Sequence, residues 1–339
     1  MRRPLMPSIS VPLGELRDRY DAVVIGSGYG GGVAALRLAE KRALRAGTVT
    51  QAHIAVFERG REWLPGGFPG TTASAFAELQ LDTGRNRYGR QTGLFDLRAD
   101  DDMMVLVGCG LGGTSLINAN VMIEPVSAVF DRGWPAALAG TVGHAVLKDH
   151  FAQVKSVLRA VPLPLDILPM KVQRMGDAGT DATPAKRPDI AVSFDTAMSP
   201  FSGVGHNRCT LCGNCVTGCN HGAKHTVDRN YLAAAVRRGV DIFCELETRT
   251  IEWVGGEWHL HVRLTDPAWG TFKAGEFVVR AGTVVLAAGA LGSTEILLRS
   301  RDRHALPLSQ KLGSRFSGNG DVIAFSYDCL LYTSDAADE

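Results

Sequence analysis

The sequence predicts an α/β fold built around a parallel sheet, because three short apolar runs each lead directly into glycine-rich sequence. The runs are residues 22–25, 103–107 and 283–288. An alanine-rich helical pattern follows the first of them, over residues 32–39. Uninterrupted apolar runs of this kind are typical of parallel strands, because helices cover both faces of a parallel sheet.

The first run ends in the pattern Gly26-x-Gly28-x-x-Gly31, with Gly30 inside the same turn. Gly26 permits a tight turn, Gly28 lets the backbone approach a pyrophosphate, and Gly31 allows the helix to pack closely on the strand. The N-terminus of that helix offers free N–H groups and a positive dipole end to phosphates. On its own, the pattern also fits an ordinary glycine-rich turn.

A further apolar run, residues 53–57, supports a nucleotide site because it ends in Glu58. A carboxylate at this strand end can accept hydrogen bonds from ribose hydroxyls. The gap from Gly31 to Glu58 is longer than usual, so we expect a loop insertion around residues 47–52. Residues 20–60 therefore predict a Rossmann-like βαβ unit that binds a dinucleotide.

The glycine-rich run at residues 108–120 follows the next predicted strand and ends in two asparagines, Asn118 and Asn120. A backbone with so few side chains can lie flat against a large planar ligand, and its amides can meet ring heteroatoms. The asparagine side chains can add hydrogen bonds. The alternative is a glycine-rich loop with structural asparagines.

Periodicity places the other elements along the chain. We expect helices over 73–81, 145–160, 226–239 and 295–299, and strands over 240–265, 272–280 and 283–288, with a hairpin turn at 255–256. The last strand leads through Gly289 toward the same sheet edge as the first glycine turn. Residues 70–100 are interpreted as a lid or connecting excursion, and the proline-rich stretch 131–208 as part of a substrate-facing domain.

Composition excludes several classes of protein. The 339 residues allow about two domains, and 45% hydrophobic with 21% charged residues is ordinary for a globular protein. The net charge of +1 does not favour a nucleic-acid partner. No apolar run reaches the roughly 18 residues of a transmembrane segment, and the N-terminus does not resemble a secretory signal. Four of the seven cysteines fall within eleven residues, so a reducing cytoplasm is the expected location.

The cysteine run has the spacing C-x2-C-x2-C-x3-C and comprises Cys209, Cys212, Cys215 and Cys219. This is the bacterial ferredoxin spacing for iron–sulfur ligation. Structural zinc sites usually separate two C-x2-C pairs by a loop. A single iron–sulfur cluster, with Cys219 either its fourth ligand or free, is therefore preferred. A zinc site and a set of small buried residues are the alternatives.

Simpler roles are expected for the residues around this run. His206, His221 and His225 are interpreted as hydrogen-bonding surface residues or as supports for the ligands. Lys224 is expected to be solvated, and the alternative is that it stabilises a reduced, more negative cluster. The remaining cysteines are interpreted as buried or incidental, namely Cys109, Cys244 and Cys329.

Three separated motifs, in this order, resemble those of the glucose–methanol–choline (GMC) oxidoreductases, nearest their cholesterol-oxidase branch. The motifs are 26–31 with 58–60, 108–118 and 286–298, with shorter likenesses at 122–125 and 318–320. The resemblance implies a discontinuous Rossmann-like FAD-binding domain with an inserted, incomplete α+β substrate domain. The expected boundaries are 20–130 and 226–300 for the FAD-binding domain, 131–208 for the substrate-domain portion, 209–225 for the cysteine segment, 301–328 for the start of a missing half and 329–339 for a non-native tail.

The resemblance also implies FAD as the cofactor. The glycines of the first turn would meet the pyrophosphate, Glu58 the adenosine ribose, and the run at 108–120 the isoalloxazine ring. The backbone near Thr248 would meet the adenine, and the segment at 288–289 would close the site. The implied cofactor-binding residues are Gly26, Gly28, Gly30, Gly31, Glu58, Arg59, Gly108, Gly112, Gly113, Ser115, Asn118, Asn120, Thr248, Ala288 and Gly289.

The implied chemistry is oxidation of an alcohol, such as a sterol or another apolar alcohol, with hydride passing to the flavin. The well-known sterol oxidases of the family lack the cysteine run, which favours electron transfer to a protein or quinone carrier over transfer to oxygen. The alternatives are a flavin and iron–sulfur electron-transfer module without alcohol oxidation, and a zinc-stapled nucleotide-binding protein.

The resemblance places the catalytic histidine and its partner beyond Gly320, so no residue is nominated as the base. Residues 330–339 are out of character with the predicted strand 322–327 and resemble translated sequencing-adaptor sequence. We expect the natural chain to continue past about Asp328, and this shorter chain to be inactive. The remaining histidines fall in contexts typical of structural residues, namely His144, His150, His259 and His304.

Overall fold

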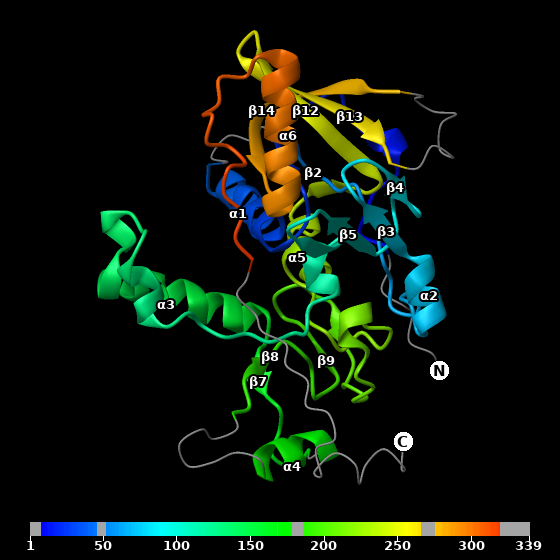
Figure 1. The fold of residues 1–339 in the computed structure, drawn as a ribbon, viewed down its shortest axis with the longest axis vertical. Helices are drawn as coiled ribbons and strands as arrows, with labels where there is room; N and C mark the ends of the chain where they lie inside the picture. The colour runs from blue at the N-terminus through cyan, green and yellow to red at the C-terminus, as the bar shows by residue number, and fades with distance from the viewer. Residues whose placement is uncertain (1–7, 46–51, 168, 178–185, 266–274, 319–339) are drawn as a thin grey trace. The chain divides into compact units, whose positions relative to one another are not determined.

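The computed structural model describes residues 8–45, 52–167, 169–177, 186–265 and 275–318 (Figure 1). The chain forms two compact units. The first comprises the residues up to 120, residues 156–159 and residues 192–314, and the second comprises residues 121–155, residues 160–191 and the chain from 315. The predicted strand 322–327, the tail 329–339, Cys329 and most of the predicted insertion at 47–52 lie outside the described residues.

A six-stranded sheet with the order β11-β2-β1-β14-β13-β12 forms the centre of the first unit. The strands are β1 (Arg19–Ile25), β2 (Ile54–Phe57), β11 (Val240–Phe243), β12 (Leu246–Val254), β13 (Glu257–Leu264) and β14 (Phe277–Leu286). β11, β2, β1 and β14 run parallel, whereas β12 and β13 form an antiparallel hairpin that pairs with β14. The predicted α/β class with a parallel sheet is confirmed, and the hairpin extends that sheet on one side.

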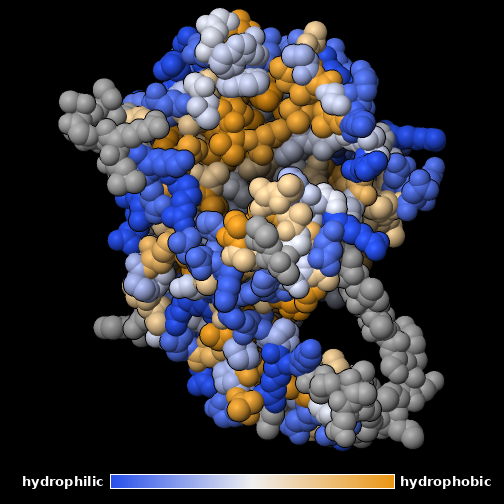
Figure 2. All heavy atoms as spheres, turned by 90° about the vertical axis from the view of Figure 1, so that its left-hand side faces the viewer, coloured by the Kyte–Doolittle hydropathy of each residue, from blue (hydrophilic) through white to orange (hydrophobic). Residues whose placement is uncertain are grey.

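β14 joins the parallel strands to the hairpin. Its residues 277–281 pair with β13, and its residues 280–286 pair with β1. The prediction of two strands, at 272–280 and 283–288, is wrong because the backbone stays extended through Gly282 while it pairs with β1. The apolar side chains of residues 284–286 are only half-buried, although β14 is an inner strand. Figure 2 shows hydrophobic residues gathered over the upper part of one face, around the first unit.

Helices cover the sheet. α1 (Tyr29–Arg45) packs on β1 and β2 and against α5 (Tyr231–Val236), and α6 (Gly289–His304) packs on β12 (Figure 1). The helix predicted over 226–239 is shorter than expected, because a 3-10 turn at Val227–Arg229 precedes α5. The helix predicted over 295–299 extends in both directions to become α6. It ends where Ala305 adopts a left-handed conformation with a φ of +52°.

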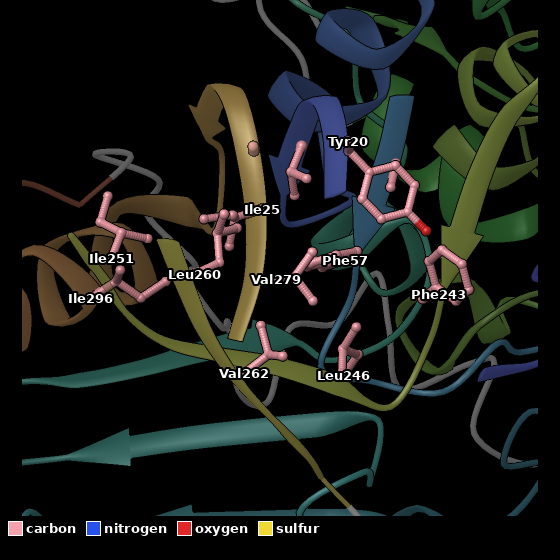
Figure 3. Close-up of a cluster of buried hydrophobic side chains, with 13 residues drawn as sticks. Tyr20, Ile25, Phe57, Phe243, Leu246, Ile251, Leu260, Val262, Val279 and Ile296 are labelled. Carbon is pink, nitrogen blue, oxygen red and sulfur yellow. The ribbon is translucent and has the colours of Figure 1, made fainter. Parts of the chain in front are cut away.

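The core of the first unit lies between the sheet and α6 (Figure 3). Tyr20, Phe57 and Phe243, from three neighbouring strands, meet edge-on with ring centroids 6.0–6.3 Å apart. Edge-on aromatic pairs contribute about 0.5–1.5 kcal/mol each beyond their burial. Ile251 of β12 and Ile296 of α6 belong to the same cluster, so the helix and the hairpin share one core with the parallel strands.

Residues 79–108 form a second, four-stranded sheet with the order β4-β3-β5-β6. Its strands are β3 (Leu79–Asp82), β4 (Arg87–Tyr88), β5 (Phe95–Ala99) and β6 (Met104–Gly108). The helix predicted over 73–81 ends early, as α2 (Thr72–Ala77), because Leu79 already pairs with Phe95. The predicted excursion is therefore organised as a sheet, and β6 carries the chain into the second glycine-rich run.

The second unit has less regular structure. It contains most of α3 (Gly140–Val157), α4 (Met170–Asp177) and the short pair β7 (Val161–Pro162) and β8 (Asp189–Ile190). The helix predicted over 145–160 starts five residues earlier than expected. Phe130 is buried beside Trp134, with ring centroids 5.0 Å apart. No helix in the described part of the chain has the length and apolar character needed to cross a membrane.

Candidate functional site

The turn after β1 is shaped by glycines with different surroundings. Gly26 has a φ of +96° and donates its N–H to the Phe57 carbonyl at 2.8 Å. A Cβ on Gly26 would lie 2.5 Å from the Ala287 carbonyl oxygen, and one on Gly31 would lie 2.0 Å from the Gly26 carbonyl oxygen. A Cβ on Gly28 would meet nothing within 4 Å. Packing therefore requires glycine at two positions, and Gly28 leaves room for a ligand to approach the backbone.

Glu58, at the end of β2, faces this turn. It is buried, and its Oε2 accepts hydrogen bonds from the Ser27 hydroxyl at 2.6 Å and the Ser27 N–H at 3.2 Å. Its Oε1 accepts the Gly60 N–H at 2.8 Å. A carboxylate offers about four acceptor directions, so Glu58 retains capacity for a ribose hydroxyl. Its position fits the predicted role, and the ribose contact itself stays a prediction.

The second glycine-rich run lies directly on the first. The Gly112 N–H donates to the Ser27 hydroxyl oxygen at 3.0 Å. A Cβ on Gly113 would lie 2.9 Å from the Gly28 Cα, so any side chain there would push the two runs apart. Both Gly112 and Gly113 have positive φ values, of 107° and 58°. Two bare backbone segments, far apart in sequence, therefore meet at one place.

The end of the second run is held by two further side chains. The buried Ser115 hydroxyl donates to the Gly112 carbonyl at 2.7 Å and accepts the Val227 N–H at 3.0 Å. The Asn118 side chain donates to the Tyr29 hydroxyl at 2.8 Å, at the start of α1. These bonds connect the run both to the first helix and to the segment before α5.

The third junction, between β14 and α6, lies beside the first. The Ala287 N–H donates to the Ile25 carbonyl at 2.8 Å, so the ends of β14 and β1 are aligned. Gly289 then starts α6 with a φ of +75°. The contact between Gly26 and Ala287 brings this junction to the turn that also supports Gly113. The structure therefore brings together the three glycine-rich segments that the sequence singled out.

Five buried side-chain oxygen atoms among the described residues of this unit have no hydrogen-bond partner, namely those of Glu78, Asn120, Asp228, Thr248 and Thr265. Asn120 and Thr248 are predicted cofactor-binding residues, and Asp228 lies beside the second glycine-rich run. The Asp228 carboxylate lies 3.2 Å from the position a Cβ would take on Gly112, and burial raises the pKa of Asp228 to about 6. Buried polar atoms normally have partners, so these are candidates for contact with a bound ligand. Sequence reasoning missed Asp228, which had no motif to mark it.

Arg59 has a protein partner in this structure. It forms an ion pair with Asp96 of β5, and Arg98 approaches the same carboxylate at 2.8 Å. Burial alone would raise the pKa of Asp96, but the two guanidinium groups hold that pKa below its usual value. The predicted cofactor contact of Arg59 therefore competes with a buried ion pair. Gly108 is also explained by packing, because a Cβ there would lie 2.8 Å from the Gly113 carbonyl oxygen.

The four cysteines of the run are unpaired and line one pocket. The Leu211 N–H donates to the Cys209 sulfur and the Ala223 N–H to the Cys219 sulfur, at 3.4 Å each. Burial raises the pKa of the free Cys209 thiol, and the charges of the neighbouring cysteines raise it further. Backbone N–H groups aimed at sulfur favour thiolate ligands over neutral thiols.

The cysteine run is fixed to the loop before α2. Asn220 accepts the N–H groups of Gly66 and Phe68 at 2.9 Å each, and its side-chain amide donates to the Phe68 carbonyl at 3.0 Å. A Cβ on Gly218 would lie 2.0 Å from the Phe68 ring. Asn220 and Gly218 therefore position the last two cysteines through contacts that do not involve sulfur.

Lys224 is buried, contrary to the expectation that it is solvated. Its ammonium donates to the carbonyl oxygens of Leu116 at 3.0 Å, Asn118 at 2.7 Å and Cys215 at 2.9 Å. Burial lowers the pKa of Lys224 to about 8, so the side chain is still mainly protonated at pH 7. The physical reason for the error is that three backbone carbonyls, from two segments far apart in sequence, replace the water around the ammonium.

His206 and His225 are also more buried than expected for surface residues. Their rings lie against each other at a tilt of 39°, with centroids 4.1 Å apart. Burial lowers the pKa of His206 to about 3 and that of His225 to about 4, so both are neutral at pH 7. His221 is exposed, as expected. Cys109 is buried and Cys244 is half-buried, which fits their expected structural roles.

Residues 20–315 match the family model for GMC oxidoreductases. The chain belongs to this family. The match covers the first strand, all three glycine-rich segments, the cysteine run and α6. GMC oxidoreductases are FAD-dependent, so FAD is the nucleotide that this fold holds.

Individual relatives agree with that assignment. The chain is 29% identical to a cholesterol oxidase of Acinetobacter baumannii over 328 residues, which are 90% of this chain and 55% of that protein. It is 30% identical over 335 residues to a cholesterol oxidase of Mycobacterium tuberculosis (strain H37Rv), covering 91% of this chain and 53% of that protein. A long-chain-alcohol oxidase of Arabidopsis thaliana is 24% identical over 291 residues, or 84% of this chain and 34% of that protein.

The chain spans about half the length of the two cholesterol oxidases. Among solved structures, a fungal aryl-alcohol oxidase aligns with a TM-score of 0.46 and 18% identity, over 84% of this chain and 48% of that protein.

Proposed function

We propose that the protein oxidises a CH–OH group to a carbonyl with FAD, on a sterol or another apolar alcohol. The observation that carries the proposal is the seating of Gly113 on Gly28, with Ser27 joined to Gly112 beside it. A dinucleotide turn alone fits NAD as well as FAD. A second bare backbone beside that turn favours a ligand with a large flat ring. The names of the cholesterol oxidases and the long-chain-alcohol oxidase support an apolar alcohol as substrate.

In this proposal the site has three sections, which would bind the pyrophosphate, the adenosine and the ring of the cofactor. The free N–H groups at the start of α1, with Gly26, Gly28, Gly30 and Gly31, would hold the pyrophosphate. Glu58 would accept the ribose hydroxyls, and the unpartnered Thr248 hydroxyl lies on the strand proposed to meet the adenine. The ring section would be formed by Gly108, Gly112, Gly113, Ser115, Asn118 and Asn120, with Arg59, Ala288 and Gly289 at its borders.

FAD, when bound, supplies the hydride acceptor. The chain's own residues bind and orient it: the Ser27 hydroxyl holds the Gly112 amide in place, and Asn118 fixes the Tyr29 hydroxyl. No described residue is proposed as the base that takes the hydroxyl proton. We propose that this base lies in a continuation of the natural chain beyond about Asp328, and that residues 1–339 alone do not turn over substrate.

We further propose that Cys209, Cys212, Cys215 and Cys219 hold one iron–sulfur cluster. The C-x2-C-x2-C-x3-C spacing favours an iron–sulfur cluster over zinc, whose structural sites usually separate two C-x2-C pairs by a loop. The N–H groups aimed at two of the sulfurs suit anionic ligands.

A cluster at this place would receive electrons from the flavin and pass them to a protein or quinone acceptor. Lys224 supports this route, because one ammonium binds the carbonyls of Asn118, in the proposed ring section, and of Cys215. Transfer of electrons to oxygen is the alternative. We also propose that residues 20–130 and 226–300 form the discontinuous FAD-binding domain. The proposed location of the protein is the cytoplasm.

Spectroscopy of the purified protein tests the proposal. We expect the visible absorbance of oxidised flavin, and bleaching of that absorbance under argon when cholesterol or a long-chain alcohol is added to the natural full-length chain. A flavin that no alcohol reduces would contradict alcohol oxidation and favour the electron-transfer module. Protein that binds no flavin, even when refolded with FAD, would contradict the proposal as a whole.

Metal analysis tests the cluster separately. We expect iron and acid-labile sulfide in the anaerobically purified protein, and loss of both in Cys215→Ser. The matched control is Cys244→Ser, which changes a cysteine outside the run. One zinc per chain without sulfide would instead support the zinc-stapled alternative.

A further inference from the structure

Three side chains of the types that bind metal ions meet beside the C-terminal end of α6. They are Glu252 of β12, His261 of β13 and His304 of α6, and one ligand atom from each lies within 4.8 Å of the other two. His261 Nε2 lies 2.9 Å from the Glu252 carboxylate, and His304 Nδ1 lies 3.2 Å from it. The two imidazole rings stack with centroids 4.6 Å apart. All three residues belong to the first unit.

We propose that Glu252, His261 and His304 form a site for a divalent transition-metal ion, with zinc as the expected occupant. Two imidazole nitrogens and one carboxylate are a set of protein ligands that zinc accepts, with water in the remaining position. Magnesium and calcium prefer sites made of oxygen ligands only.

Each histidine has a further polar neighbour on its other ring nitrogen. His304 Nε2 lies 2.9 Å from the Thr250 hydroxyl, and His261 Nδ1 lies 3.5 Å from the Glu276 carboxylate. Arg303 in turn pairs with Glu276 at 2.7 Å. Histidines that bind metal usually have such a partner on the other nitrogen, because it fixes the ring orientation and the tautomer. This arrangement directs both inner nitrogens toward the Glu252 carboxylate.

The local charge favours a cation. Glu252 and Glu276 contribute two negative charges and Arg303 one positive charge, while the carbonyl end of α6 adds a partial negative charge. The side chains of Glu252, His261 and His304 are 26%, 14% and 11% exposed, so the site is enclosed but an ion can reach it from solvent. A bound ion would tie the last turn of α6 to the β12–β13 hairpin.

Cobalt binding to a tag-free, chelator-treated chain tests the site. Cobalt substitutes for zinc and reports its ligands, because thiolates give an intense charge-transfer band that imidazole and carboxylate do not. We expect a cobalt ion with only ligand-field bands, in addition to any cobalt bound by the cysteine run. We also expect zinc at a hundredfold excess over its Kd to raise Tm by about 4 °C.

Variants assign these signals to the site. His261→Ala and His304→Ala should lose the cobalt bands without charge transfer and the zinc-dependent rise in Tm. His150→Ala is the control, because His150 is exposed on α3, in the second unit, away from the three ligands. Glu252→Gln keeps the shape of the side chain, so it tests the site if the alanine variants unfold. The proposal is overturned if cobalt gives only thiolate bands, or if Glu252→Gln and the wild type bind equal amounts of metal.

Discussion

Replacing Lys224 with methionine removes the ammonium that joins the second glycine-rich run to the cysteine run. Methionine has nearly the same length, so the change removes hydrogen bonds without leaving a large cavity. Three buried carbonyls lose their donor, at about 2 kcal/mol each, or roughly 6 kcal/mol in total. Against this, the shift of the Lys224 pKa from 10.5 to about 8 means that burial of the charge costs about 3 kcal/mol, which the variant recovers. The expected net loss in the free energy of unfolding is about 3 kcal/mol.

Urea unfolding of the wild type and Lys224→Met at pH 7, followed by circular dichroism, measures this loss. Lys148→Met is the matched control, because Lys148 is exposed on α3 and its replacement should stay within about 0.5 kcal/mol of the wild type. A second arm uses pH. The unfolded chain binds more protons than the folded chain between the folded pKa of about 8 and the unfolded value of 10.5, so wild-type stability gains relative to the variant as pH rises through that window. The reasoning would be refuted if Lys224→Met were as stable as Lys148→Met, either at pH 7 or at the upper end of the pH window.

Three other variants probe the same unit. Asp228→Asn should raise the free energy of unfolding by about 3 kcal/mol at pH 7, because the pKa of Asp228 rises from 3.8 to about 6 on folding. The gain should disappear below pH 3.8, and a pH-independent effect in urea titrations would contradict this explanation. Gly113→Ala should lower Tm and weaken FAD binding more than Gly255→Ala, since both have a φ near +60° but only Gly113 is packed, against Gly28. Ser27→Ala should cost about 2 kcal/mol by calorimetry, because the buried hydroxyl donates to the Glu58 carboxylate and accepts the Gly112 N–H; an unchanged Tm would argue against this linking role.

Local sequence was sufficient to predict the geometry of the glycine turn after β1 and the place of Glu58 beside it. The turn around Gly26 is determined by residues within a few positions, and Glu58 follows its strand directly. The alignment of β1 with β14 was predictable because each strand runs without a break into a glycine and a helix. The glycine turn and the strand–glycine–helix junction are both short stretches of sequence, and steric clashes leave their backbones few allowed conformations.

The parts that were not predicted depend on contacts between distant residues. Lys224 looked solvated because nothing near it in sequence indicates the Leu116 and Asn118 carbonyls. In the sheet of residues 79–108, the strand predicted over 103–107 is confirmed as β6, but β3, β4 and β5 were missed since they are short and partly polar. Glu252, His261 and His304 have no motif spacing, so only the packing of α6 on the hairpin brings them together.

The pairing of β1 with β14 also has a consequence for synthesis of the chain. Arg19 pairs with Arg280, so about 260 residues separate partners in the centre of the sheet. At roughly 5–20 residues per second, β1 waits about 13–50 s on the ribosome before its partner emerges. During that time the edge of β1 that later pairs with β14 has no native neighbour. This edge can bind chaperones or pair with the wrong strand. The glycine turn after β1 is therefore translated early, but its contact with the end of β14 is completed late.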